Sequence, residues 1–248
     1  MFPTFVDTIL RLYCLRKSSA FIWFLRRKGV KIGTACVFYN PKKTLVDLTR
    51  PYLLEIGNCV KIAEGCTILT HGFEWCVLRE VYGRPFGGCA KVTIGDNVFI
   101  GMHATILKGV NIGSNVIIGA GSVVSRDIPD NTVAAGNPAK SLMSLEEYYQ
   151  KIITREWSEA KGQAKAYFEC YGREPNEDIF FKSYFFLFLE RSLSNFPAEV
   201  KHQVGCHWEK FLHSKPFFPS YRDFLEACFK DETGKFKERE PRRVNHAE

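Results

Sequence analysis

The sequence predicts an all-β solenoid, preceded by one helix and followed by several more. Aliphatic residues recur at every sixth position between 94 and 124, and a glycine follows four of the six. The fifth place of each hexad is also small or aliphatic. A helix repeats its apolar residues every three or four positions and a flat strand alternates, so a period of six indicates short strands joined by tight bends. The aliphatic positions are Ile94, Ile100, Ile106, Ile112, Ile118 and Val124.

Stacked coils of this kind bury a column of Ile and Val that no single repeat could bury alone. We expect each of these aliphatic side chains to point inward. We expect the glycine that follows it to occupy a corner of the coil, because glycine tolerates φ and ψ angles that other residues avoid.

Residues 1–29 predict a basic amphipathic helix. An apolar stripe runs through this segment, and the first 50 residues contain ten Lys or Arg against only Asp7 and Asp47. Such a helix can cap the open end of the solenoid or lie on an anionic membrane surface. A basic end would also suit nucleic acid, but no RNA- or DNA-reading motif is present, so we expect no nucleic-acid partner.

The solenoid is predicted over residues 30–143. A weaker hexad register begins at Ile32, and irregular early coils are expected around Pro41 and Pro51. This early register does not meet the later one, since 26 residues separate Ile68 from Ile94. A segment is therefore inserted between them. The positions of the early register are Ile32, Phe38, Thr44, Arg50, Ile56, Ile62 and Ile68.

The inserted segment, residues 71–91, reads as a loop because it contains four glycines and Pro85 and suspends the hexad pattern. Loops that stand out from a rigid scaffold often carry function. This one brings together His71 and several charged or aromatic residues, which makes it the candidate reaction site.

Residues 144–248 predict a helical extension. Ser144 and Glu147 have the spacing of a capping box, and the helix that they open should stop at Gly172. A second, aromatic-rich helix is expected at about residues 178–192, and a third from Ser220. This extension could pack on the solenoid, mediate assembly or bind an acceptor.

The cysteines favour a cytoplasmic protein. There are nine, and none is arranged as Cys-x-x-Cys, which disfavours a disulfide framework or a zinc knuckle. Cys36 and Cys66 fall at small inward positions and are predicted to fill the core. The apolar run at residues 18–25 is too short to span a bilayer, and no signal peptide is evident. The inner face of the membrane is where the basic helix would bind.

The hexads, the loop that begins at His71 and the closing sequence AAGNPAK at 134–140 together resemble the hexapeptide-repeat acyltransferases. Within that superfamily they are most similar to bacterial sugar and capsular polysaccharide O-acetyltransferases. The resemblance covers about residues 30–143. It implies a left-handed parallel β-helix and a homotrimer, with acetyl-CoA in the groove between neighbouring solenoids and no required metal.

By its position in the motif, the resemblance implies that His71 is the general base. Imidazole can accept a proton from a sugar hydroxyl near pH 7, and a backbone N–H could stabilise the oxyanion. Relatives often carry an acidic residue directly after this histidine, whereas this chain has Gly72. If that acid orients the imidazole, then Glu74 or a backbone carbonyl must do so here.

The resemblance also implies binding residues for both substrates. Glu74 is a candidate for binding the acceptor, Trp75 for stacking on a sugar ring, and Arg84 for meeting an anionic group. Met102, Ala120 and Ser125 correspond to positions along the pantetheine arm, and Arg126 and Lys140 to positions near the phosphates. His103 is expected at the surface or at an interface.

The predicted function is acetyl-CoA-dependent O-acetylation of a sugar or a polysaccharide precursor by direct attack. N-acetylation of an amino sugar and a non-catalytic hexapeptide scaffold remain as alternatives. A zinc carbonic anhydrase is disfavoured, because only His71 and His103 lie within residues 30–143 and such a site needs three histidines. An acyl-enzyme on Cys66 or Cys76 would predict ping-pong kinetics.

Overall fold

The computed structural model describes residue 10 and residues 12–192 and 195–230. The chain forms two compact units, Met1–Tyr149 and Gln150–Glu248.

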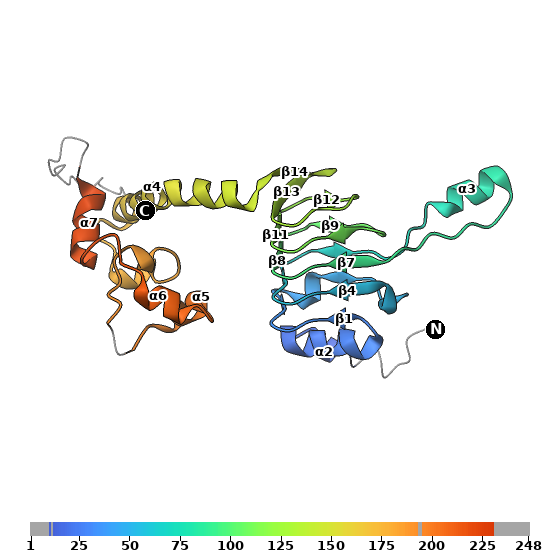
Figure 1. Ribbon diagram of the computed structural model, residues 1–248, viewed down its shortest axis with the longest axis horizontal. Helices are drawn as coiled ribbons and strands as arrows, with labels where there is room; N and C mark the ends of the chain where they lie inside the picture. Colours follow the sequence, from blue (N-terminus) through green and yellow to red (C-terminus); the bar gives the residue numbers. More distant parts are fainter. Residues whose placement is uncertain (1–9, 11, 193–194, 231–248) are drawn as a thin grey trace, which may run out of the picture. The chain divides into compact units, whose positions relative to one another are not determined.

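The first unit contains three sheets that the chain visits in rotation (Figure 1). All their pairings are parallel except the last, where β13 pairs antiparallel with β14. The first sheet consists of β1 (Lys31–Ile32), β4 (Leu54–Ile56), β7 (Val92–Ile94) and β10 (Asn111–Ile112). The second consists of β2 (Val37–Phe38), β5 (Lys61–Ile62), β8 (Val98–Ile100), β11 (Val116–Ile118), β13 (Thr132–Gly136) and β14 (Ala139–Ser144). The third consists of β3 (Leu45–Val46), β6 (Thr67–Ile68), β9 (Thr105–Ile106) and β12 (Val123–Val124).

The hexad register between 94 and 124 is confirmed residue by residue. Each predicted aliphatic position ends a strand and is at most 3% exposed. Residues one coil apart stand in register, as in Ile94 opposite Ile112 and Ile100 opposite Ile118. The fifth-place residues are buried beside them. The repeat therefore builds one continuous apolar core.

The early register is wrong at two positions. The hexad count predicts Thr44 as the inward position after Phe38, whereas the strand residue found there is Val46, which pairs with Ile68. Two short 3₁₀ helices, η1 (Pro41–Lys43) and η2 (Pro51–Leu53), add residues where the sequence suggests irregular coils. With η1, eight residues rather than six separate the inward residues Phe38 and Val46; with η2, ten separate Val46 and Ile56. The added residues total six, so the hexad count is correct again at Ile56. Neither Thr44 nor Arg50 holds an inward strand position.

The glycines serve a different purpose from the one expected. Left-handed backbone occurs at the fourth place of a hexad, as in Asn97 (φ 55°) and Asn115 (φ 57°). Asparagine tolerates this conformation, and the amide of Asn97 donates to that of Asn115 at 3.0 Å. The glycine after each aliphatic residue is needed for close stacking instead, since a Cβ on Gly57 would lie 2.7 Å from the carbonyl oxygen of Gly95.

Helix α2 (Ser18–Lys28) closes the end of the solenoid at which β1 lies (Figure 1). Phe21, Ile22, Phe24 and Leu25 are buried in the same apolar cluster as the coils. A continuous helix over residues 1–28 is not observed, because a turn occupies residues 15–17. The part of that prediction at residues 1–9 and 11 lies outside the described residues.

The inserted segment is not loop throughout, because it contains helix α3 (Trp75–Tyr82). No glycine or proline lies between positions 73 and 82, and Gly83 ends the helix with φ 65°. The base of the insertion is paired: Gly72 N–H donates to Gly88 O at 3.0 Å and Ala90 N–H to Thr70 O at 3.0 Å.

The predicted first and third helices of the extension are confirmed. Helix α4 (Leu145–Tyr171) begins at the capping box, where Glu147 N–H donates to Ser144 Oγ at 3.1 Å, and it ends before Gly172. Helix α7 (Tyr221–Phe229) is capped by Ser220. Two short helices, α5 (Ala198–Val204) and α6 (Trp208–His213), were not predicted.

The helix predicted at residues 178–192 is wrong. The segment contains only two 3₁₀ turns, η3 (Glu177–Phe180) and η4 (Phe185–Leu187). The Arg191 guanidinium donates to the carbonyls of Phe186 and Leu189, so a side chain satisfies backbone groups that a helix would pair. The aromatic rings instead form a core around Phe180, Phe188 and Phe224. Among the described helices, none combines the length and apolar character that a membrane span requires.

Candidate active site

His71 stands at the first residue of the insertion, three residues beyond the buried Ile68 of β6. Its imidazole is 16% exposed, and its Nδ1 lies 2.5 Å from Oδ2 of Asp47. The side chain of Thr49 is also close, with Oγ1 3.2 Å from Nδ1. The pairing of β3 with β6 brings Asp47, directly after β3, beside the segment that leads to His71.

Asp47 is 3% exposed and accepts hydrogen bonds on both oxygens. Oδ2 accepts from Thr70 N–H at 3.0 Å and from Thr70 Oγ1 at 2.5 Å. Oδ1 accepts from Thr49 N–H at 2.9 Å and from Thr49 Oγ1 at 2.7 Å. Burial by itself would raise the pKa of Asp47, but the hydrogen bonds from Thr70, Thr49 and His71 outweigh it and hold that pKa well below its usual range.

The ionised Asp47 fixes the tautomer of His71. A carboxylate can only accept, so Nδ1 must carry the proton that it donates to Asp47. The remaining nitrogen, Nε2, then has a free lone pair and can accept a proton from a substrate. A carboxylate that orients a histidine whose Nε2 can accept a proton is the arrangement of a general base with its orienting group.

Asp47 was missed by the sequence reasoning, which considered Glu74 or a backbone carbonyl for this role. The hexad count predicted Thr44 and Arg50 as the inward positions after Phe38, so Val46 was not recognised as the strand residue that pairs with Ile68, and Asp47 was not placed beside the segment that leads to His71. One signal was available: Asp47 is one of only two acidic residues in the first 50 positions, and it follows an inward aliphatic residue.

The carboxylate partner of the His71 imidazole is Asp47 rather than Glu74, which forms an ion pair with Lys108 and is near enough to His71 to interact with it electrostatically. The hydrogen bond from Lys108 lowers the pKa of Glu74, so this carboxylate is also ionised. A Cβ on Gly72 would overlap Oε2 of Glu74. The Glu74 carboxylate thus occupies the space that a side chain at position 72 would fill, directly beside His71.

The aromatic neighbour of His71 is Phe73 rather than Trp75. The rings of His71 and Phe73 meet edge to face with centroids 5.0 Å apart, and Trp75 lies beyond Phe73 at 6.2 Å. Arg84 is exposed, with its guanidinium 4.3 Å from the centre of the Phe86 ring. The structure therefore brings Glu74 close to His71 and leaves Trp75 and Arg84 farther along the insertion.

The predicted donor residues lie on two different corners of the coil. Met102 and Ala120 follow β8 and β11 in consecutive coils, and Gly121 N–H donates to Met102 O at 2.7 Å. Ser125 and Arg126 follow β12, a strand of the third sheet, which also contains β6, the strand before His71. Lys140 lies on β14, opposite Ala135. All five side chains are exposed.

His103 is exposed at the same corner as Met102, with its backbone in the left-handed region (φ 59°). Its ring lies over Gly65 of the neighbouring coil, where a Cβ would overlap it. This agrees with the predicted surface position.

Cys66 is buried in the core of the solenoid, and Cys36 packs against that core while partly exposed. Burial raises the pKa of Cys66 and of Cys36, and each thiol donates to a backbone carbonyl at 3.1 Å. Neither is poised as a nucleophile. Within the described residues, no three His, Cys, Asp or Glu side chains gather as a metal site would require.

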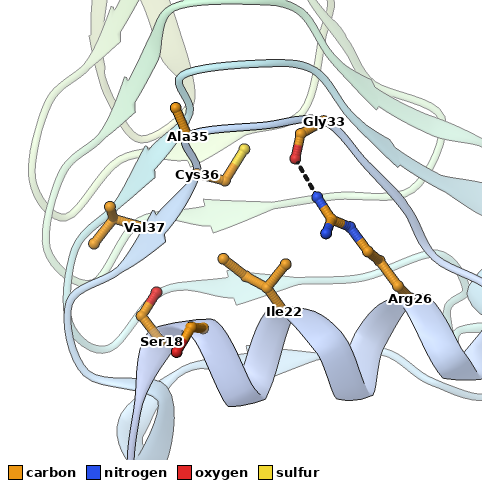
Figure 2. A pocket seen from close by; sticks show the side chains of 8 residues that line it. Ser18, Ile22, Arg26, Gly33, Ala35, Cys36 and Val37 are labelled. Atoms are coloured by element: carbon orange, nitrogen blue, oxygen red, sulfur yellow. Dashed lines mark hydrogen bonds between the residues drawn. The ribbon is translucent and has the colours of Figure 1, made fainter. Parts of the chain in front are cut away.

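A separate cavity of about 490 Å³ lies between α2 and the first coil, as Figure 2 shows. Ser18, Ile22 and Cys36 line it, and Arg26 reaches across it to donate to the carbonyl of Gly33 at 2.6 Å. None of its lining residues belongs to the cluster around His71.

Comparison with known proteins identifies the repeat. The family described as "Bacterial transferase hexapeptide (six repeats)" matches residues 91–126. Protein CapG of Staphylococcus aureus is 42% identical over 129 residues, which cover 52% of this chain and 74% of CapG. Galactoside O-acetyltransferase of Escherichia coli K12 is 38% identical, and the match covers 52% of this chain and 63% of that enzyme. Among solved structures, a hexapeptide-repeat acetyltransferase of Vibrio cholerae matches 56% of this chain and 89% of its own, with 23% identity and a TM-score of 0.43.

Proposed function

Because the chain belongs to the family of hexapeptide-repeat acetyltransferases, we propose that it transfers an acetyl group from acetyl-CoA to a hydroxyl of a sugar or polysaccharide precursor. The observation that carries this proposal is the buried Asp47 carboxylate, 2.5 Å from Nδ1 of His71. It leaves Nε2 as the proton acceptor beside an exposed insertion. The named relative that transfers to a galactoside oxygen supports a sugar as the acceptor.

The reaction needs one base and no covalent enzyme intermediate. Acetyl-CoA supplies an acetyl group already activated as a thioester. His71 Nε2 removes the proton of the acceptor hydroxyl as that oxygen bonds to the carbonyl carbon. Asp47 stabilises the imidazolium that results. His71 then returns the proton to the departing sulfur as the carbon–sulfur bond breaks, which restores the enzyme.

Glu74 is proposed to bind the acceptor. Its carboxylate is ionised, 60% exposed and fixed by Lys108 beside His71. It can therefore accept a hydrogen bond from a second hydroxyl of the sugar while Nε2 engages the first. Phe73 offers a ring face next to the imidazole, and Trp75 and Arg84 would contact more distant parts of a larger acceptor.

A homotrimer would explain why the predicted donor residues occupy two corners. Met102 and Ala120 of one copy could then face Ser125 and Arg126 of its neighbour across a shared groove, with Lys140 near the phosphates. Family membership supports this assembly and a left-handed coil. The insertion also exposes a row of apolar side chains on and before α3 that a neighbouring copy would cover, namely Phe73, Val77, Val81 and Tyr82.

Nine free cysteines support a reducing compartment and thus a cytoplasmic location.

The proposal is tested by following thiol release from acetyl-CoA with a panel of sugars, nucleotide sugars and capsule oligosaccharides. We expect His71→Ala to reduce turnover at least a hundredfold, as loss of a general base typically does. His202→Ala, an exposed histidine of α5, is the matched control and should leave turnover unchanged. Wild-type turnover in His71→Ala would refute the assignment.

The product distinguishes the alternatives. An acetyl ester is released by mild alkali and an acetamide is not, so an alkali-stable product would replace O-acetylation by N-acetylation of an amino sugar. No thiol release with any acceptor would favour the non-catalytic scaffold.

A further inference from the structure

The end of the solenoid closed by α2 presents an unusual outer surface. The inner face of α2 is buried against the first coil, whereas Trp23, on the opposite face, is 50% exposed. Tyr13 and Leu12, just before the helix, are 66% and 63% exposed. Three large apolar side chains on and just before α2 are thus exposed to solvent and lie outside the buried core.

Cations surround these side chains. Residues 12–31 contain no Asp or Glu. The Arg27 guanidinium lies 5.7 Å from the centre of the Trp23 ring, and that of Arg16 lies 5.9 Å from the centre of the Tyr13 ring. Lys17 is exposed between them in the sequence.

Arg26 does not belong to this surface, because it donates to the carbonyls of Ile32 and Gly33 at 3.1 and 2.6 Å (Figure 2). We call the group Leu12, Tyr13, Arg16, Lys17, Trp23 and Arg27 the α2 outer face.

We propose that the α2 outer face binds the surface of an anionic lipid bilayer. Trp and Tyr favour the headgroup region, where an amphipathic ring has one apolar and one hydrated side. Lys and Arg beside them are attracted to negative headgroups. The apolar stripe of α2 is already used in the core, so the protein would lie on the membrane through its rings and charges without inserting the helix.

A bilayer fits this surface better than nucleic acid does. Base stacking uses open ring faces in a basic groove that follows the strand. Here Arg16 and Arg27 already lie over the two rings, and the surface is made by α2 and the segment just before it. Binding to nucleic acid is therefore an outcome that would count against the proposal.

The test is sedimentation of the full-length protein with sucrose-loaded vesicles. One set is phosphatidylcholine alone and the other contains one-third phosphatidylglycerol. We expect binding only to the anionic set, with loss of most binding in 0.5 M NaCl. The triple variant Arg16→Gln, Lys17→Gln, Arg27→Gln should weaken partitioning on the order of a hundredfold, at about fivefold per cation. Trp23→Ser should weaken partitioning at low salt as well.

The matched control removes three exposed lysines of the second unit, Lys182→Gln, Lys201→Gln and Lys210→Gln, which changes the net charge equally. It should keep most of its binding. Thiol release with a soluble acceptor reports whether each variant is folded, and it also separates failure of this proposal from failure of the proposed reaction. Equal loss in both triple variants, equal binding to neutral vesicles, or binding to a DNA or RNA oligonucleotide but not to anionic vesicles would overturn the proposal.

Discussion

Replacing Asp47 by Asn preserves the shape of the side chain but removes its charge and one acceptor. Oδ2 receives fixed donors from Thr70 N–H and His71 Nδ1–H, whereas Oδ1 receives only one fixed donor, Thr49 N–H. The amide oxygen should therefore take the Oδ2 position and the amide nitrogen should face Thr49. His71 keeps its tautomer but loses a charged partner, and Thr49 N–H loses its acceptor.

The magnitude follows from these two losses. A hydrogen bond to a charged group stabilises its partner by about 1–2 kcal/mol more than a bond between neutral groups does. The imidazolium formed in the reaction loses that stabilisation, so kcat should fall roughly 5- to 30-fold. The KM for acetyl-CoA should not change. The unpaired Thr49 N–H should lower the free energy of unfolding by about 1–3 kcal/mol at pH 7.

The pH dependence has a definite sign. The folded-state pKa of Asp47 lies below its ordinary value of 3.8, so its contribution to stability is complete above about pH 5. That contribution is lost as the pH falls further, toward the folded-state pKa. The difference in free energy of unfolding between wild type and Asp47→Asn should shrink accordingly between pH 5 and pH 2.5.

Thiol release and urea unfolding measured at several pH values check both effects. A variant with wild-type kcat would refute the orienting role of Asp47, whatever its stability.

Two further predictions concern the insertion and the coil. Lys108→Met removes the ion pair that holds the Glu74 carboxylate, so the KM for the acceptor should rise severalfold while the KM for acetyl-CoA stays constant. Lys108→Arg should restore the acceptor KM, and Lys61→Met, at an exposed lysine, is the control and should have no effect. An unchanged acceptor KM in Lys108→Met would remove Glu74 from the acceptor site. Gly57→Ala should destabilise the first unit by several kcal/mol, because its Cβ would lie 2.7 Å from Gly95 O. Gly162→Ala, in α4 with open space around it, should instead stabilise the second unit by about 0.5–1 kcal/mol. Urea unfolding of both variants checks this, and an unchanged free energy of unfolding in Gly57→Ala would contradict the close-stacking argument.

The later coils could be predicted from the sequence because their period is local. Each aliphatic residue from Ile94 to Val124 repeats after six positions, and the strand pairings follow that spacing. In the early coils the same six-residue count failed. Pro41 and Pro51 begin turns whose extra residues together restore the phase at Ile56, so the counting succeeded at Ile56 while it failed at Val46.

The candidate site was predicted in the same uneven way. His71 was found because it opens the interruption of the repeat. Asp47 is far from it in sequence and is brought to it only by the pairing of β3 with β6, which the wrong register concealed. Lys108 was missed because nothing in the sequence links it to Glu74, 34 residues earlier.

The C-terminal unit shows another limit. Helices with a cap and a stop residue, such as α4 between Ser144 and Gly172, could be predicted from their ends. Residues 178–192 have abundant aromatic residues, but the carbonyls of Phe186 and Leu189 accept from the guanidinium of Arg191, a contact that no helical pattern reveals.

The stacking of the coils also sets the distance between His71 and the end of the solenoid that α2 closes. His71 follows the second coil and Asp47 the first, so the reacting nitrogen stands about one strand spacing, roughly 5 Å, above the first coil. That coil is closed by α2, and a helix has a diameter of about 10 Å. A protein resting on a bilayer through α2 would thus hold its base at a height of roughly 15 Å, and an acceptor anchored in that bilayer would have to reach this height. Each additional coil inserted between α2 and β4 would raise the base by about 5 Å, so if the proposed reaction takes place on a membrane-anchored glycan, the number of early coils would select the sugar residue within reach of His71.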